Sequence, residues 1–403
     1  MRRILPLLPF AMLLVILPFP GTVAARLLLL VICFGVALRY WWRVPGMRAP
    51  IPCKPVLAAW IAVAVASLAY AFDPAYTLGE LKNELGYTMM AFFAFFTIAG
   101  ERQNARWLLL ASLAGFVLIG SVAVTTWLAH GREWQERAVH GGIGVFGTYL
   151  VTILPVVAWF AVDARSSRSR WIALGLGGFL LFLAAIVAQR AVWPVLAIQA
   201  MLLLLVTARH GRRAMDCFVL IGSAVAIVAF AGAGLLYSQY ARFSSPESPT
   251  MSTDVRFAFW PKVVANIAEH PLAGAGFGRD VMRRAYPELI PPETPSLWHA
   301  HNVFLNYGLQ LGLPGMLALA GVFLALVVHF TRATAVSGGA VAGVAGLMLV
   351  AGVVLRNQFN DFFLRDMSLL FWALTGLLAR LSLSASSASA SDEQREIRHE
   401  ATA

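Results

Sequence analysis

Residues 295–315, PSLWHAHNVFLNYGLQLGLPG, join the only long polar segment inside the chain to an apolar run of helical length. They place the imidazoles of His299 and His301 beside the amide of Asn302, where that helix is predicted to begin. The apolar run from 302 to 330 is long for one membrane crossing, so the helix is expected to tilt or to start above the bilayer. The rest of the chain determines which side of a membrane these histidines face.

The composition excludes a soluble globular protein. Of the 403 residues, 59% are hydrophobic and 13% are charged, whereas soluble domains carry about 25% charged residues. The apolar runs have the length of membrane helices, and the ten-residue alternation of a membrane barrel is not seen. The predicted fold class is therefore an all-α polytopic membrane protein.

We expect about 12 transmembrane helices and a large helical loop on one side of the membrane. Helices one to nine occupy residues 1–236, the loop 237–300, helices ten to twelve 301–382, and a disordered tail 383–403. The expected spans lie near residues 4–20, 22–41, 54–72, 86–100, 106–128, 142–163, 171–188, 191–208, 215–237, 302–330, 337–355 and 364–382.

The basic residues indicate the orientation of these spans. If the N-terminus is cytoplasmic, most of the 31 Lys and Arg residues lie in the short loops of that side. The positive-inside rule then favours both termini inside and places 237–300 on the outer face. The net charge of +11 reflects this topology, so no nucleic-acid partner is expected.

The outer loop is too long to be a bare connection and is a candidate functional domain. A helix is expected over 255–270, VRFAFWPKVVANIAEH, with Val255, Phe259, Val263 and Ile267 along one apolar stripe. Pro261 is expected to kink this helix or to mark its start. A second, basic helix is expected over 279–289, so the loop forms a helical cap on the outer surface.

The histidines have two interpretations. The imidazole of His301 can act as a general base near neutral pH, with Asn302 orienting it or a substrate hydroxyl. Alternatively, these residues cap the following helix. His299 is the weaker candidate and is given a supporting role.

Two histidines without nearby paired carboxylates are too few for a metal site, and the three cysteines have no metal-ligand spacing, so no metal and no cofactor are expected.

Several arginines could bind an anion on the same side. Arg190 lies in a tight outer hairpin, where it either snorkels to lipid headgroups or holds a phosphate with its planar fork. Arg256 offers a second cation or is a solvated charge. Arg279 begins a basic edge that meets phosphates or anionic lipid. In the last outer loop, Asp366 could pair with a histidine or an arginine, or belong to an ion-pair network.

A base, several fixed cations and no strong metal site together fit group transfer from a diphosphate leaving group. Cations stabilise the negative charge that develops on the diphosphate, and the base removes a proton from an acceptor hydroxyl. A helix bundle in lipid would admit an apolar donor from the side. A lipid-linked sugar carrier is the alternative from another class, for which charges at mid-membrane would be expected.

The chain resembles a known family through two motifs. His301, Asn302, Gly312 and Gly315 match the pattern H-[NSQ]-x9-G-x-x-G of bacterial O-antigen ligases, which share a fold with O-antigen polymerases and O-linked protein oligosaccharyltransferases. The segment HPLAGAGFG, residues 270–278, is similar to one that these proteins carry in their large periplasmic loop.

The resemblance implies a bacterial inner-membrane enzyme with a periplasmic site and both termini in the cytoplasm. The family's reaction transfers O-antigen from undecaprenyl diphosphate to a sugar hydroxyl of lipid A-core. It implies His301 as the base, Arg190 and Arg256 as diphosphate binders, and Asp366 or Asp361 as the acidic residue near the last span. A polymerase or a protein oligosaccharyltransferase would use the same kind of donor, and the oligomeric state stays open.

Overall fold

The computed structural model is helical throughout the part of the chain that it describes. The described residues are 5–131, 134, 141–164, 166–209, 255–290, 298–336, 338–361, 363 and 365–400. The expected span at 215–237 lies outside them, as does most of the first part of the large loop. The all-α prediction is confirmed, and the expectation of about 12 spans stays a prediction.

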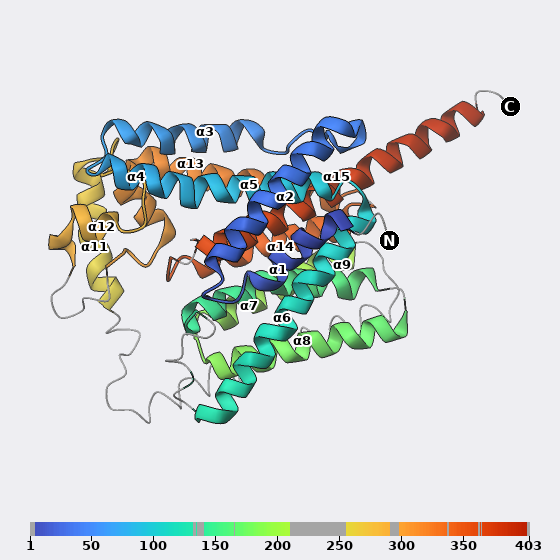
Figure 1. Ribbon diagram of the computed structural model, residues 1–403, viewed down its shortest axis with the longest axis horizontal. Helices are drawn as coiled ribbons and strands as arrows, with labels where there is room; N and C mark the ends of the chain where they lie inside the picture. The colour runs from blue at the N-terminus through green and yellow to red at the C-terminus, as the bar shows by residue number, and fades with distance from the viewer. Residues whose placement is uncertain are drawn as a thin grey trace.

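The helices run back and forth between two ends of one bundle (Figure 1). The chain starts at one end, and α11 and α12 lie at the other, which we call the site end. The helices are α1 (Leu8–Ile16), α2 (Val23–Arg43), α3 (Lys54–Ala66), α4 (Pro74–Glu80), α5 (Tyr87–Ile98), α6 (Arg102–His130), α7 (Ile143–Asp163), α8 (Ser167–Val187), α9 (Val192–Arg209), α11 (Val255–Glu269), α12 (Val281–Ala285), α13 (Val303–Thr334), α14 (Ala340–Arg356) and α15 (Arg365–Glu400). The 3-10 segments η1, η2, η3 and η8 cover Leu5–Leu7, Pro45–Met47, Ser67–Ala69 and Pro287–Leu289, and the π-helix η4 covers Leu81–Gly86.

The described helices identify a multi-pass membrane protein. Six of them are long and apolar enough to cross a bilayer, and four more apolar helices are shorter. The six are α2, α6, α7, α8, α13 and the Arg365–Leu383 part of α15. The backbone of α15 continues as helix to Glu400, while the side chains beyond Leu383 lie outside the description, so disorder of the tail 383–403 stays a prediction.

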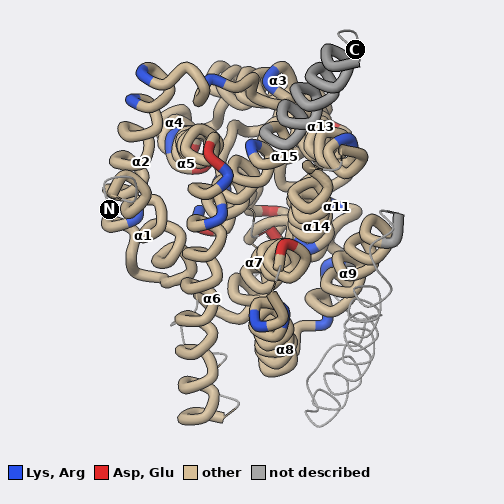
Figure 2. The backbone as a smooth tube through the Cα atoms, turned by 90° about the vertical axis from the view of Figure 1, so that its right-hand side faces the viewer, with Lys and Arg blue, Asp and Glu red and all other residues tan. Residues whose placement is uncertain are grey.

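The centre of the bundle is α14, which packs against α7, α9, α13 and α15; Figure 2 shows many of these helices close to end-on. Small residues allow this close packing, as is common between membrane helices. A Cβ on Gly343 would lie 2.8 Å from the carbonyl oxygen of Phe330. Gln199 of α9 links α7 and α14, because its amide donates to the carbonyls of Val151 (3.0 Å) and Met348 (2.8 Å).

Helix α13 contains a break at Gly312, where φ is 68° and ψ is −164°. The break removes two helical hydrogen bonds. The Leu313 N–H would normally donate to the carbonyl of Leu309, but it donates to Pro271 instead (2.8 Å). Pro314 has no N–H for the carbonyl of Gln310. Two carbonyls in the middle of an apolar helix therefore need donors from elsewhere.

The segment 271–278 supplies these donors. The Ala275 N–H donates to Leu309, and the Gly276 N–H donates to Gln310, both at 3.0 Å. The approach is so close that a Cβ on Gly274 would lie 2.2 Å from the carbonyl oxygen of Leu309. The HPLAGAGFG segment and the glycine break are therefore two halves of one backbone pairing.

The helical cap is largely as predicted. Helix α11 has Pro261 inside it without a break, and its stripe of Phe259, Val263 and Ile267 is buried against α12 and α13. The second basic helix is much shorter than expected. It covers only five residues, Val281–Ala285, because its chain turns at Tyr286 and continues into a 3-10 turn that begins at Pro287.

Replacing Gly312 by Ala tests the break. Its φ and ψ lie in a region that L residues rarely adopt, and a Cβ would meet the Pro271 carbonyl oxygen at 2.7 Å. We expect a loss of about 1–3 kcal/mol, seen as a lower midpoint of thermal unfolding in detergent. The matched control is Gly321→Ala in the same helix, where the nearest atom is 3.5 Å away. Equal midpoints for the two variants would contradict this account.

Candidate functional site

Asn302 begins α13 and is its N-cap. Its Oδ1 accepts hydrogen bonds from the N–H groups of Phe304 (2.9 Å) and Leu305 (3.1 Å). Its Nδ2 donates to the carbonyl of Gln358 at 3.1 Å. The capping interpretation of Asn302 is thus confirmed, and its binding of substrate stays a prediction.

His301 lies just before this cap with a left-handed backbone, φ 49°. Its N–H donates to Nδ1 of His299 at 3.1 Å, and the two rings stack with centroids 3.9 Å apart. Its own Nδ1 lies 2.9 Å from Oδ1 of Asn360. Non-glycine residues with positive φ are uncommon and are often found at functional sites.

His299 is a poor candidate for the base. Its side chain is buried, and burial, followed by the nearby charges of His301 and Arg279, lowers its pKa to about 3. The ring is therefore neutral at physiological pH and binds a proton weakly. Its Nδ1 already accepts a hydrogen bond from the backbone N–H of His301, and its supporting role stays a prediction.

The loop after α14 contacts residues 298–302, which we call the histidine loop. The carbonyl of Asn357 accepts from the Val303 N–H at 3.0 Å. Asn306 donates to Asp361 and accepts from the Ala300 N–H at 2.8 Å. Residues 357–361, NQFND, are therefore fixed against the first turn of α13. We call this segment the amide loop.

Asp361, and not Asp366, is the carboxylate that contacts the first turn of α13. Its side chain is buried and bonded to Asn306. Burial raises its pKa, and this effect exceeds the lowering by the hydrogen bond from Asn306 and by Arg279. Asp366 forms an ion pair with the buried Arg26 of α2, so the structure gives it a partner other than a histidine.

Arg279 lies beside the histidines. Its guanidinium carbon is 4.7 Å from the centre of the Trp298 ring, and that ring lies 4.4 Å from the ring of His299. The Nε of Arg279 is buried and has no hydrogen-bond partner among the described residues. The other two arginines of the basic edge form exposed ion pairs, Arg283 with Asp280 and Arg284 with Asp73.

Arg256 also contacts the site directly, because it donates to the carbonyl of Phe359 in the amide loop. Arg190 is connected to the site through α14. The residue before it, Gln189, accepts a hydrogen bond from Arg356, the last residue of α14. The Nε of Arg190 is buried without a hydrogen-bond partner among the described residues.

Sequence reasoning overlooked Asn306 and Asn360. The charged residues of LRNQFND, residues 355–361, draw attention away from its amides. A signal was present, since Asn306 follows four residues after Asn302 in the same helix and the loop carries three amides in four residues.

Among the described residues, no group of three or more His, Cys, Asp and Glu could hold a metal ion.

The arrangement combines a half-buried imidazole, a neutral histidine beneath it and two cations in contact with the same loops. It can take a proton from a hydroxyl and bind an anion next to that hydroxyl.

A family match covers this region. Residues 153–320 match the family described as O-antigen ligase. The matched segment runs from within α7 to within α13 and contains Arg190, Arg256, Arg279, both histidines and the Gly312 break. A comparison with curated proteins gave no match. Over these residues, the chain is similar to the O-antigen ligase family.

Proposed function

We propose that the protein transfers O-antigen polysaccharide from undecaprenyl diphosphate to a sugar hydroxyl of lipid A-core, at the periplasmic face of the inner membrane. The family match supports a reaction of the O-antigen ligase or polymerase type. The observation that carries the proposal is that His301 contacts the amide loop, which also binds Arg256, and stacks on His299, whose neighbour Trp298 contacts Arg279. The distribution of Lys and Arg supports the periplasmic side and cytoplasmic termini.

In the proposed reaction, Nε2 of His301 removes the proton of the acceptor hydroxyl. The oxygen attacks the anomeric carbon of the donor from the face opposite the diphosphate, so the configuration inverts. The bond to the diphosphate breaks, and its electron pair stays on the leaving oxygen. Arg279, Arg256 and Arg190 stabilise that charge. The proton then leaves the imidazole to solvent.

An enzyme fits the described site better than a lipid-linked sugar carrier does. A carrier needs a substrate site near mid-membrane, formed by broken helices that can face either side. Here Arg256 and Arg279 contact loops that precede α13 or follow α14. An O-antigen polymerase or a protein oligosaccharyltransferase would use the same donor site. The three enzymes differ in their acceptor. Purified protein and lipid-linked donor can be mixed with lipid A-core, O-antigen or peptide, and the acceptor that receives the glycan identifies the enzyme.

His301→Ala should abolish transfer. Removal of a general base typically lowers rates about 10²–10⁴-fold, which in cells appears as loss of the O-antigen ladder on a lipopolysaccharide gel. The control is His329→Ala, whose imidazole lies near the C-terminal end of α13 and bonds to Ser382. Normal ladders from membrane-inserted His301→Ala protein would refute the assignment of the base.

Arg279→Ala should raise the donor KM about 10- to 100-fold, the value expected for a charge-assisted hydrogen bond to a diphosphate. Arg283→Ala is the control, because this neighbouring arginine is exposed and paired with Asp280. The measurement is initial rate against donor concentration with purified protein. Equal KM values for the two variants would count against donor binding by Arg279.

A further inference from the structure

The amide loop holds one side chain, Asn360, directly against the proposed base. Its neighbours on both sides are fixed. Arg256 binds the carbonyl of Phe359, and Asn306 binds the carboxylate of Asp361. Asn302 binds the carbonyl of Gln358 at 3.1 Å. The Asn360 side chain is thus placed by a backbone that is tied to α11 and to α13.

We propose that Asn360 is the positioning residue of His301, which selects the tautomer that can act as a base. This inference rests on the proposed function. The Oδ1 of Asn360 lies 2.9 Å from Nδ1 of His301. An oxygen there accepts a hydrogen bond, so Nδ1 carries the hydrogen and Nε2 carries the lone pair. The same bond fixes the plane of the ring, whose backbone is already held by His299.

An amide differs from a carboxylate in this position because it has no charge. A carboxylate beside an imidazole stabilises the protonated form and raises its pKa. The amide orients the ring and leaves it neutral, so that it can accept a proton near neutral pH.

The test compares Asn360→Ala and Asn360→Asp with wild type, using purified full-length protein and lipid-linked donor. Asn360→Ala should lower kcat about tenfold or more with the donor KM unchanged, since orientation is lost. Asn360→Asp keeps an acceptor oxygen and should retain more activity at high pH. The acid limb of its pH–kcat profile should move up by about one unit.

Asn104→Ala is the control, because it removes an amide at the start of α6 that donates to the carbonyl of Ile98 at 3.2 Å, at the opposite end of the bundle from the histidines. It should leave both kcat and the pH profile near wild type. An unchanged kcat in Asn360→Ala, or an Asn360→Asp profile that superimposes on wild type, would overturn the positioning role. If His301→Ala keeps its activity in the same assay, the proposed function itself fails, so the two failures are distinguishable.

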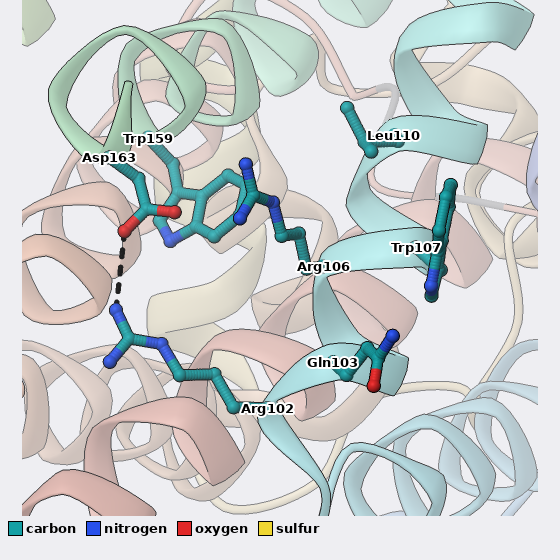
Figure 3. Close-up of a pocket in the computed structure, with 7 residues that line it drawn as sticks. All are labelled: Arg102, Gln103, Arg106, Trp107, Leu110, Trp159 and Asp163. Atoms are coloured by element: carbon teal, nitrogen blue, oxygen red, sulfur yellow. Dashed lines mark hydrogen bonds and ion pairs between the residues drawn. The ribbon is translucent and has the colours of Figure 1, made fainter. Parts of the chain in front are cut away.

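A separate observation lies at the other end of the bundle. A partly open cavity of about 510 Å³ lies between the start of α6 and the end of α7, and Arg102, Arg106, Trp107, Trp159 and Asp163 are among its lining residues (Figure 3). Arg102 forms an ion pair with Asp163 at 3.2 Å. This pair leaves the positive charge of Arg106 in excess, in a cavity that two indole rings also line.

We infer that this cavity binds the phosphate of an anionic phospholipid. Both helices are long enough to cross a bilayer, so their ends lie at the level of the headgroups, where Trp is enriched. Basic pockets between membrane helices are suited to anionic headgroups. The apolar wall of Trp107 and Leu110 continues along α6 and would accompany an acyl chain.

Native mass spectrometry of the detergent-purified protein tests this site with phosphatidylglycerol, phosphatidylcholine and inorganic phosphate. Arg106→Gln should weaken phosphatidylglycerol binding about fivefold. Arg43→Gln, which removes an exposed arginine at the end of α2, should not. Equal binding by the two variants would overturn the site. Equal affinity for phosphatidylcholine, or binding of phosphate without lipid, would overturn the assignment to an anionic phospholipid.

Discussion

Two backbone carbonyls of α13, those of Leu309 and Gln310, determine much of the site end. The break at Gly312 and the missing N–H of Pro314 deprive them of helical donors. In an apolar bundle an unsatisfied carbonyl costs several kcal/mol, so a second segment must approach α13 at this level. Residues 275 and 276 do so with their own N–H groups, and the glycines of that segment make the approach sterically possible.

This pairing has a consequence for charge. The Gly278 N–H donates to the side chain of Gln310 in α13. This bond fixes the position of the next residue, Arg279, relative to α13. Its guanidinium meets Trp298, which follows the cap and precedes the histidines. A backbone requirement of α13 thus places a cation near the histidines.

The sequence predicted the features that depend on local pattern. The helical class, the bounds of α11 and its buried stripe follow from hydrophobic periodicity, which is a property of neighbouring residues. The choice of His301 as the base stays a prediction, and the structure adds that burial lowers the pKa of His299 and that its Nδ1 accepts a hydrogen bond from His301. Contacts between distant segments could not be predicted in this way. Asn360 meets His301 across 59 residues, and Arg26 meets Asp366 from opposite ends of the chain.

The site is built from amides where many enzymes use carboxylates. Asn302, Asn306, Gln358 and Asn360 hold the histidine loop, and Asp361, the acid among them, is buried with a raised pKa. An ionised carboxylate near the cations Arg256 and Arg279 would pair with them and weaken their attraction for a diphosphate. Amides supply the same directional hydrogen bonds without competing for positive charge. The choice of amides therefore serves both halves of the proposed reaction, since it keeps the base neutral and the cations available.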